Sequence, residues 1–238
     1  MYDFEKLKNE IKTNFEKELK NWCESQNVEY VEEGENRKAL ESKYSEWVKA
    51  EMENAKLEEE KEKIQKRFEF GWSKVPTRYK NASVSDLRQT EFLKSVLSGS
   101  NALILGANGT GKTHMAYSVM REWLLKGETV QIFKALELLS AIKSEENPYR
   151  FIAMNYKNNI KHLIIDEIDK IFESKADFVY LNYLIDMRYE WELQTIVIGN
   201  GTKEGFLSSI GQSVFRRLTT DGGAFVEIQE KKKKENEK

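Results

Sequence analysis

An eight-residue glycine-rich segment constrains what this chain can fold into more than any other feature. It matches the pattern G-x-x-x-x-G-K-[ST] in full, with the residues Gly106, Ala107, Asn108, Gly109, Thr110, Gly111, Lys112 and Thr113. An apolar run over 102–105 precedes the segment, and a helical pattern starts at Lys112. In such a unit the loop N–H groups and the positive end of the helix bind phosphates. Lys112 would neutralise the β- and γ-phosphates and the Thr113 hydroxyl would bind Mg²⁺, so the segment predicts a site for ATP with Mg²⁺.

An acidic pair follows a second apolar run. Asp166 and Glu167 come directly after residues 162–165. At the end of a parallel strand, Asp166 would lie beside the phosphate-binding loop and bind Mg²⁺ together with Thr113. Glu167 would orient and deprotonate the attacking water, so the pair favours ATP hydrolysis. The alternative is that the two acids only cap a following helix.

Two further positions are candidates for hydrolysis. A predicted strand over 195–199 ends at Asn200, whose side chain would hold the attacking water near Glu167; the alternative is an ordinary Asn-Gly turn. Arg216 and Arg217 lie on a predicted helix before the last strand. One of them would contact the γ-phosphate of a neighbouring subunit, as an arginine finger does, or both are solvated surface residues.

Short apolar runs alternate with amphipathic helical stretches after residue 70. The runs cover 102–105, 130–133, 162–165, 196–198 and 225–228, and the helical stretches cover 112–125, 135–143, 178–190 and 203–218. This alternation predicts an α/β fold in which a parallel five-stranded sheet is flanked by helices.

The first 70 residues differ in composition from the rest. They hold 14 Lys+Arg and 19 Asp+Glu, no proline and one glycine, Gly34. Apolar residues at spacings of three and four predict two helices separated by a turn at Gly34, the second helix being long. We expect Trp22, Tyr44 and Trp47 to be exposed as anchors for a partner protein; the alternative is an appendage that packs only on itself. The expected domains are 1–70, 71–229 and a charged disordered tail, 230–238.

Overall composition excludes several classes of protein. The net charge of −2 excludes a nucleic-acid binder that acts by overall attraction, although a local basic patch stays possible. Cys23 is the single cysteine, so an intrachain disulfide and a cysteine-rich zinc site are excluded, and His114 and His162 cannot replace the missing ligands. No apolar run has the length of a signal peptide or of the ~18-residue membrane span. We therefore expect a reduced, soluble protein of the cytoplasm.

Residues 75–82, Val-Pro-Thr-Arg-Tyr-Lys-Asn-Ala, resemble the P-x-R-Y-x-x-A segment of the DnaC/IstB group of AAA+ ATPases. The resemblance continues through 106–113, 163–167, 173–188 and 214–218, and it covers roughly residues 71–229. It implies a P-loop AAA+ fold of the ASCE type and a DnaC-like ATPase that assembles on DNA. The C-terminal Ser-x-Arg sensor of the family has no match, because Glu230–Lys234 is lysine-rich there.

The resemblance also implies roles for individual residues. Lys112 and Thr113 would bind the nucleotide, Asp166 and Glu167 would be the metal-site and catalytic acids, Asn200 the sensor, and Arg217, rather than Arg216, the arginine finger. Tyr79 and its neighbours would lie near the adenine. The best-known members load a DnaB-type replicative helicase onto single-stranded DNA, with slow ATP turnover that partners stimulate. The alternatives are an IstB-type helper that acts with a transposase on duplex DNA, and an adaptor that binds nucleotide without turnover.

Candidate DNA contacts combine aromatic and basic side chains. They are Tyr149, Arg150 and Phe151, together with Tyr156-Lys157 and Ser174-Lys175. Such interleaving suits base stacking with phosphate contact on a single strand. The alternative is core aromatics beside ordinary surface charges.

Overall fold

The computed structural model describes residues 4–157, 159–171, 175–220 and 222–228, with side chains from residue 12 onward and, after the gap at 172–174, from residue 177. Ser174, the side chain of Lys175 and the predicted tail at 230–238 therefore lie outside the described residues. The chain divides into two compact units, Met1–Glu62 and Lys63–Lys238. No helix in the described part of the chain is long and apolar enough to cross a membrane.

The first unit is a pair of helices, as predicted. They are α1 (Phe4–Gln26) and the first part of α2 (Glu35–Ser73), and Gly34 before α2 has a φ of 99°. The apolar stripes of the two helices face each other and bury Leu19, Trp22, Cys23, Leu40 and Tyr44. This unit therefore has a small core of its own.

Burial in this core corrects the expectation that three aromatic residues are exposed. Trp22 and Tyr44 are each 8% exposed, and their rings lie 5.5 Å apart between the helices. Of the three, only Trp47, at 38% exposure, remains accessible, and Phe15, at 36%, also packs against Tyr44. The prediction was wrong for Trp22 and Tyr44 because the stripe of each helix packs against the stripe of the other.

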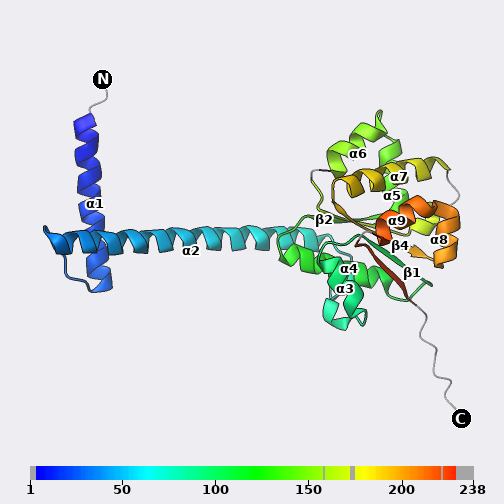
Figure 1. Ribbon diagram of the computed structural model, residues 1–238, viewed down its shortest axis with the longest axis horizontal. Coiled ribbons are helices and arrows are strands. Elements are labelled where there is room, and N and C mark those ends of the chain that lie inside the picture. The colour runs from blue at the N-terminus through cyan, green and yellow to red at the C-terminus, as the bar shows by residue number, and fades with distance from the viewer. Residues whose placement is uncertain (1–3, 158, 172–174, 221, 229–238) are drawn as a thin grey trace, which may run out of the picture. The chain divides into compact units, whose positions relative to one another are not determined.

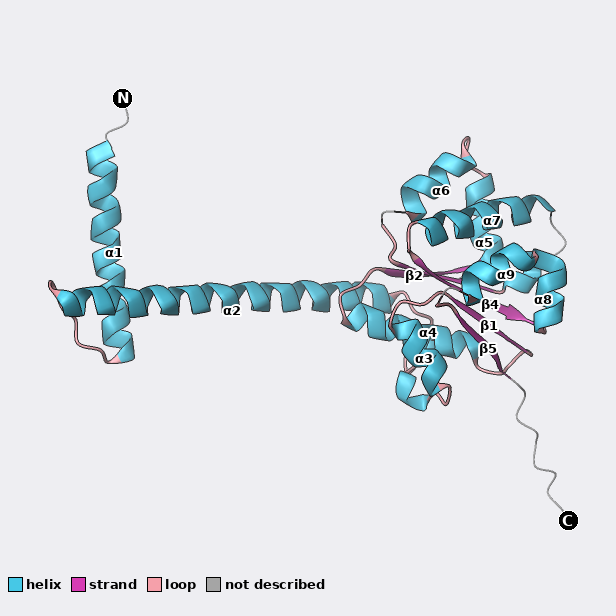
Figure 2. Ribbon diagram, in the orientation of Figure 1, coloured by secondary structure: helices cyan, strands magenta, loops and turns pink. Residues whose placement is uncertain are grey.

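The second unit contains a five-stranded parallel sheet, which confirms the predicted fold class (Figure 2). The strands are β1 (Ala102–Gly106), β2 (Val130–Lys134), β3 (His162–Asp166), β4 (Gln194–Asn200) and β5 (Ala224–Ile228), in the order β2-β3-β4-β1-β5. Strand β4 lies between β1 and β3. Since all strands are parallel, the phosphate-binding loop, Asp166 and Asn200 all lie at the carboxyl edge of the sheet.

Helices cover both faces of the sheet (Figure 1). One face packs against α3 (Thr90–Leu97) and α4 (Lys112–Leu125). The other face packs against α5 (Ala135–Lys143), α6 (Pro148–Tyr156), α7 (Lys175–Glu190), α8 (Lys203–Ile210) and α9 (Gln212–Thr219). Successive strand residues point to opposite faces, so Ile104 and Ile164 belong to the first core and Leu103 and Leu163 to the second.

The helix predicted over 203–218 is two helices in the structure. The break lies at Gly211, which has a φ of 90° and separates α8 from α9. A left-handed residue ends the hydrogen-bonded run of an α-helix, and glycine adopts this conformation without a steric penalty. The apolar period continues across the break, which is why the pattern alone predicted one helix.

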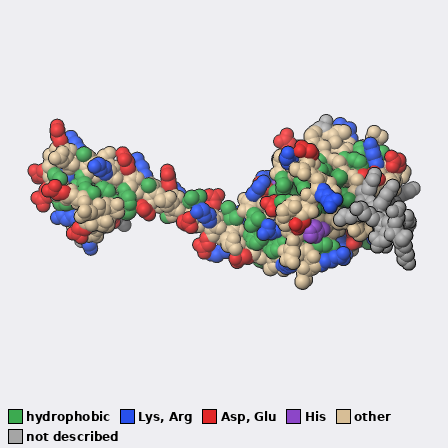
Figure 3. All heavy atoms as spheres, turned by 90° about the horizontal axis from the view of Figure 1, so that it is seen from below, with side chains coloured by type: hydrophobic (Ala, Val, Ile, Leu, Met, Phe, Trp, Pro, Cys, Tyr) green, Lys and Arg blue, Asp and Glu red, His purple; other side chains and the backbone are tan. Residues whose placement is uncertain are grey.

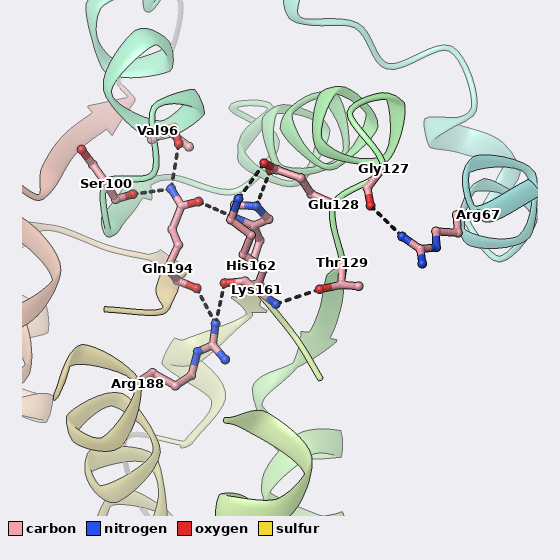
Figure 4. A network of polar contacts seen from close by, with 10 residues as sticks. All are labelled: Arg67, Val96, Ser100, Gly127, Glu128, Thr129, Lys161, His162, Arg188 and Gln194. Carbon is pink, nitrogen blue, oxygen red and sulfur yellow. Dashed lines mark hydrogen bonds and ion pairs between the residues drawn. The ribbon is translucent and has the colours of Figure 1, made fainter. Parts of the chain in front are cut away.

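The last turns of α2 belong to the second unit and pack on the end of α4. Phe68 and Trp72 stack at 5.9 Å and lie against the core that contains Trp123. A Cβ atom on Gly127 would lie 2.7 Å from Cγ1 of Ile64, so the helix approaches this turn closely. Nη1 of Arg67 donates to the Gly127 carbonyl at 3.4 Å (Figure 4).

Candidate nucleotide-binding site

The phosphate-binding loop connects β1 to α4. Gly106 has a φ of 148°, and a Cβ atom there would lie 2.4 Å from the carbonyl oxygen of Ile228, so only glycine fits. Gly109 and Gly111 have φ values of 79° and 93°. Nζ of Lys112 donates to the carbonyls of Gly106 and Ala107 at 2.9 and 2.7 Å, which holds the lysine inside the loop. The loop therefore has the backbone that a phosphate cradle requires.

Thr113 and Asp166 meet at the start of α4. Oγ1 of Thr113 donates to Oδ2 of Asp166 at 2.8 Å, and the backbone N–H of Glu167 donates to Oδ1 at 2.7 Å. Burial raises the pKa of Asp166, and burial lowers the pKa of Lys112. A buried carboxylate beside a hydroxyl is an oxygen donor set of the kind that Mg²⁺ prefers, so these two residues fit the metal.

Glu167 has a φ of 56°, a left-handed backbone that costs a non-glycine residue about 1–2 kcal/mol. This turn brings its side chain into the cavity that Lys112 and Asp166 also line. Nζ of Lys134, at the end of β2, lies 3.5 Å from Oε1 of Glu167. The side chain of Glu167 is 40% exposed, so water can reach it.

A cavity of about 270 Å³ brings most of the predicted nucleotide residues together. Its lining includes Tyr79, Asn108, Gly109, Gly111, Lys112, Thr113, Asp166, Glu167 and Asn200. Tyr79 stacks on Tyr117 with ring centroids 4.6 Å apart, and burial raises the pKa of Tyr117. Tyr79 therefore lines the cavity with Tyr117 packed against its ring, and its place beside the adenine stays a prediction.

Three residues that line the same cavity had no predicted role in the site: His114, Asp169 and Gly199. Arg78 also lines the cavity and is a neighbour of Tyr79, for which a place near the adenine was expected. Arg78 and His114 adjoin predicted residues along the chain. Asp169 follows Asp166 by three residues and accepts hydrogen bonds from Asn200. The closeness of Asp169 to an acidic pair at a strand end was the one signal that could have indicated it.

Arg217 lies away from the cavity. Its backbone carbonyl accepts a hydrogen bond from Asn101, the residue before β1, and its Nε lies 2.9 Å from Oδ1 of Asp186. The five residues of β1, at about 3.3 Å each, separate Asn101 from the loop by roughly 15 Å. An arginine at this edge cannot contact the nucleotide of its own chain, so a finger role requires a second subunit. Arg216 is exposed.

The candidate DNA residues have different surroundings. Tyr149 is 45% exposed and contacts Tyr183 at 4.8 Å and Tyr180 at 5.6 Å. Arg150 is exposed, whereas Phe151 is half-buried against the core and Tyr156 is buried. The packing of Phe151 and Tyr156 agrees with the alternative interpretation, in which they are core aromatic residues and not DNA contacts.

Strand β1, which leads into the phosphate-binding loop, and strand β3, which ends at Asp166, are separated by β4. This strand order, together with the cavity, defines a P-loop fold of the AAA+ ATPase class. The sequence profile of the "IstB-like ATP binding protein" family matches residues 13–215, and the chain belongs to this family. The predicted DnaC/IstB resemblance is thus confirmed, and the chain belongs to a family of ATP-binding proteins.

Individual relatives agree with this assignment. The chain is 31% identical over 129 residues to the replicative helicase loader DnaC of Escherichia coli K12, a match that covers 51% of each protein. The chain thus spans about half the length of the curated relatives it matches. Its fold is similar to the DnaC helicase loader structure, with a TM-score of 0.53, 19% identity and coverage of 64% of this chain and 99% of that one. It is also similar to AMPPCP-bound DnaA from Aquifex aeolicus, with a TM-score of 0.54, 21% identity and coverage of 65% and 51%.

Burial of Asp166 predicts a pH-dependent effect of the Asp166→Asn substitution. Because the folded pKa of Asp166 is raised, the folded state binds this proton more tightly than the unfolded chain does. The free energy of unfolding therefore falls as pH rises from about 4, the unfolded value, through the raised pKa. Without nucleotide or Mg²⁺, Asp166→Asn should gain thermal stability over the natural protein across this interval. Melting curves from about pH 4 to 8 measure the difference, with Asp86→Asn at an exposed position as control; a difference that is the same at every pH would contradict the prediction.

Proposed function

We propose that this ATPase loads a ring-shaped, DnaB-type replicative helicase onto single-stranded DNA. The observation that carries the proposal is the similarity to DnaC loaders, at 31% identity over half the chain. The fold similarity supports it, because it extends over 99% of the chain in the DnaC helicase loader structure.

In the proposed ATPase cycle, Lys112 binds the β- and γ-phosphates, and Thr113 and Asp166 hold Mg²⁺, which neutralises phosphate charge when bound. Glu167 takes the proton of the attacking water, and Asn200 holds that water. Arg217 acts on the nucleotide of an adjacent subunit, so the active form contains at least two chains. The ATP-bound state favours self-association and DNA binding, and hydrolysis releases the client. Turnover is slow until DNA or the helicase stimulates it.

The first unit is the proposed contact with the helicase. Among the described side chains of this unit, the exposed aromatic ones are Phe15 and Trp47. Aromatic side chains of this kind often dominate binding energy at protein interfaces. Trp22 and Tyr44 support this surface from below and are not contacts themselves.

Gel filtration with light scattering tests the helicase contact. The full chain and a replicative helicase from the same genome are mixed with ATP and Mg²⁺, and we expect them to elute together. Trp47→Gln should weaken the complex, whereas Met52→Gln, at a residue of the same helix that is 60% exposed, should not. An absence of complex while ATPase activity is intact would contradict the loader function.

The tyrosines on α6 and α7 form the proposed DNA contact. Tyr149 and Tyr183 are 45% and 37% exposed, and they pack edge to face. On the face of the second unit seen in Figure 3, basic side chains are interspersed with acidic ones. Figure 3 views the molecule from below, so this face is not the one that carries α6 and α7. At α6 and α7 the proposed contact is stacking of bases on the exposed tyrosine rings.

Replacing Tyr183 by alanine should weaken single-stranded DNA binding by about 5- to 150-fold, since stacking on one base contributes about 1–3 kcal/mol. Tyr183→Phe should bind like the natural protein, because the ring is retained. Fluorescence anisotropy with a labelled oligothymidine and ATP measures the affinity. Val179→Ala, at another exposed residue of α7, is the matched control. Equal affinities for all four proteins would contradict this site.

A second candidate is an IstB-type helper of transposition. The family description itself, "IstB-like ATP binding protein", favours it. Such a helper would bind duplex DNA at least as well as single strands and would form a complex with a transposase instead of a helicase. Competition between duplex and single-stranded oligonucleotides separates the two functions.

A further inference from the structure

The carboxylate of Asp169 contacts Asn200 through both of its oxygens. Oδ1 accepts the backbone N–H of Asn200 at 2.9 Å, and Oδ2 accepts the side-chain Nδ2–H at 3.0 Å. Asp169 belongs to the short 3₁₀-helix Ile168–Ile171 that follows β3, and Asn200 is the last residue of the adjacent strand β4. The contact therefore joins the ends of two neighbouring strands at the nucleotide cavity.

These two bonds determine how the carboxamide of Asn200 is turned. A carboxylate can only accept hydrogen bonds, so the NH₂ group must face Asp169 and the amide oxygen Oδ1 must face away from it. One N–H and the amide oxygen then remain for other partners. Asn200 lines the cavity together with Lys112 and Glu167, so a nucleotide and water bound there would be the available partners of these two groups.

Gly199 permits the close approach of Asp169. A Cβ atom on Gly199 would lie 2.6 Å from Cγ2 of Ile168, a residue with 0% exposure. A side chain at this position would push the 3₁₀-helix away from β4. The packing of Ile168 over Gly199 thus places Asp169 within reach of Asn200.

The charge of Asp169 also acts on Lys112. Burial lowers the pKa of Lys112, while the carboxylates of Asp166 and Asp169 oppose that change. Asp169 could therefore serve the site by two routes. Action through Lys112 would change ATP affinity, whereas action through Asn200 would change the rate of hydrolysis.

We propose that Asp169 is a positioning residue for ATP hydrolysis, holding the amide oxygen of Asn200 toward the attacking water. The proposal rests on the role proposed above for Asn200 and is independent of the client protein. Asp169→Asn keeps the shape of the side chain but offers an NH₂ group to Asn200, which favours the reversed amide. The amide oxygen of Asn200 would then face residue 169 instead of the water.

Single-turnover hydrolysis by the full chain with Mg²⁺ tests the proposal. Asp169→Asn should slow hydrolysis by roughly 10- to 100-fold, the range for loss of a group that orients a functional residue. The Kd for a fluorescent ATP analogue should change by less than about 2-fold. In an Asn200→Ala background, Asp169→Asn should slow hydrolysis by less than about 2-fold further, because the amide through which it acts is gone. Melting curves report folding, and Asp169→Ser replaces Asp169→Asn throughout if the latter does not fold.

Other results would overturn the proposal. If the double variant shows the product of the two single rate reductions, from Asp169→Asn and from Asn200→Ala, then Asp169 acts independently of Asn200. If Asp169→Asn weakens ATP binding but leaves the hydrolysis rate unchanged, then Asp169 acts through Lys112. A normal rate in Asn200→Ala alone would remove both the role of Asn200 and that of Asp169. Failure to bind a helicase changes none of these rates, so it is distinguishable from failure of this proposal.

Discussion

Substituting Glu167 by glutamine is expected to reduce ATP hydrolysis by at least about 100-fold while ATP binding persists. A positioned base contributes about 10²- to 10⁴-fold to a rate, and glutamine has no basic oxygen of comparable strength. Glu167 lines the cavity beside Lys112 and Asp166 but forms none of the loop contacts that would hold phosphates. Phosphate release under single-turnover conditions measures the rate, and binding of a fluorescent ATP analogue measures affinity.

The matched control for this prediction is Glu137→Gln, at an exposed glutamate of α5. It should hydrolyse ATP like the natural protein. Equal rates for Glu167→Gln and the natural protein would remove Glu167 from catalysis. A chain that binds ATP but shows no measurable turnover with or without DNA and helicase would instead agree with the non-catalytic adaptor.

Arg188→Met is expected to destabilise the second unit by about 3–5 kcal/mol. Arg188 is 0% exposed, and its guanidinium donates to the carbonyls of Tyr156, Ile160, Lys161 and Gln194 and to Oγ1 of Thr195. Figure 4 shows the bonds to Lys161 and Gln194. These five partners are neutral oxygens, and burial lowers the pKa of Arg188 to about 10. Methionine fills the volume but donates nothing, so four buried carbonyls would lose a donor.

Differential scanning calorimetry measures this loss. At about 2–4 °C per kcal/mol for a unit of this size, the melting temperature should fall by roughly 10 °C. Arg188→Lys keeps a charge but cannot reach all five oxygens, so an intermediate loss is expected. Arg121→Met, at a half-buried arginine of α4, should shift the melting temperature only slightly. A melting temperature for Arg188→Met within about 2 °C of the natural protein would contradict the argument.

Short-range pattern predicted much of the second unit. The helices α4 and α5 have the predicted bounds, residues 112–125 and 135–143. The eight residues of the phosphate-binding loop are consecutive, so their type and order alone dictate the backbone that binds phosphates. Asp166 and Glu167 were predictable for a related reason, because a carboxylate pair directly after a buried parallel strand lies at the carboxyl edge of the sheet.

Predictions failed where a residue's neighbour comes from elsewhere in the chain. An amphipathic stripe indicates that a helix face is covered but not which element covers it, and therefore Trp22 and Tyr44 were expected to be exposed. The break at Gly211 was hidden for a similar reason, since the apolar period continues through it. Ser174 and the tail at 230–238 lie outside the described residues.

A P-loop nucleotide site, an acidic pair after a buried strand and a helical appendage could all be predicted, because each depends on residues close together in the chain. The position of β4 between β1 and β3 depends on tertiary packing, and it brings Asn200 to the cavity and places Asp169 against it. Tertiary packing also decides that Arg217 lies at the opposite edge of the sheet from its own nucleotide cavity. Strand order and the burial of a side chain depend on packing between segments that are distant in the chain. The local periodicity of the sequence therefore does not predict them.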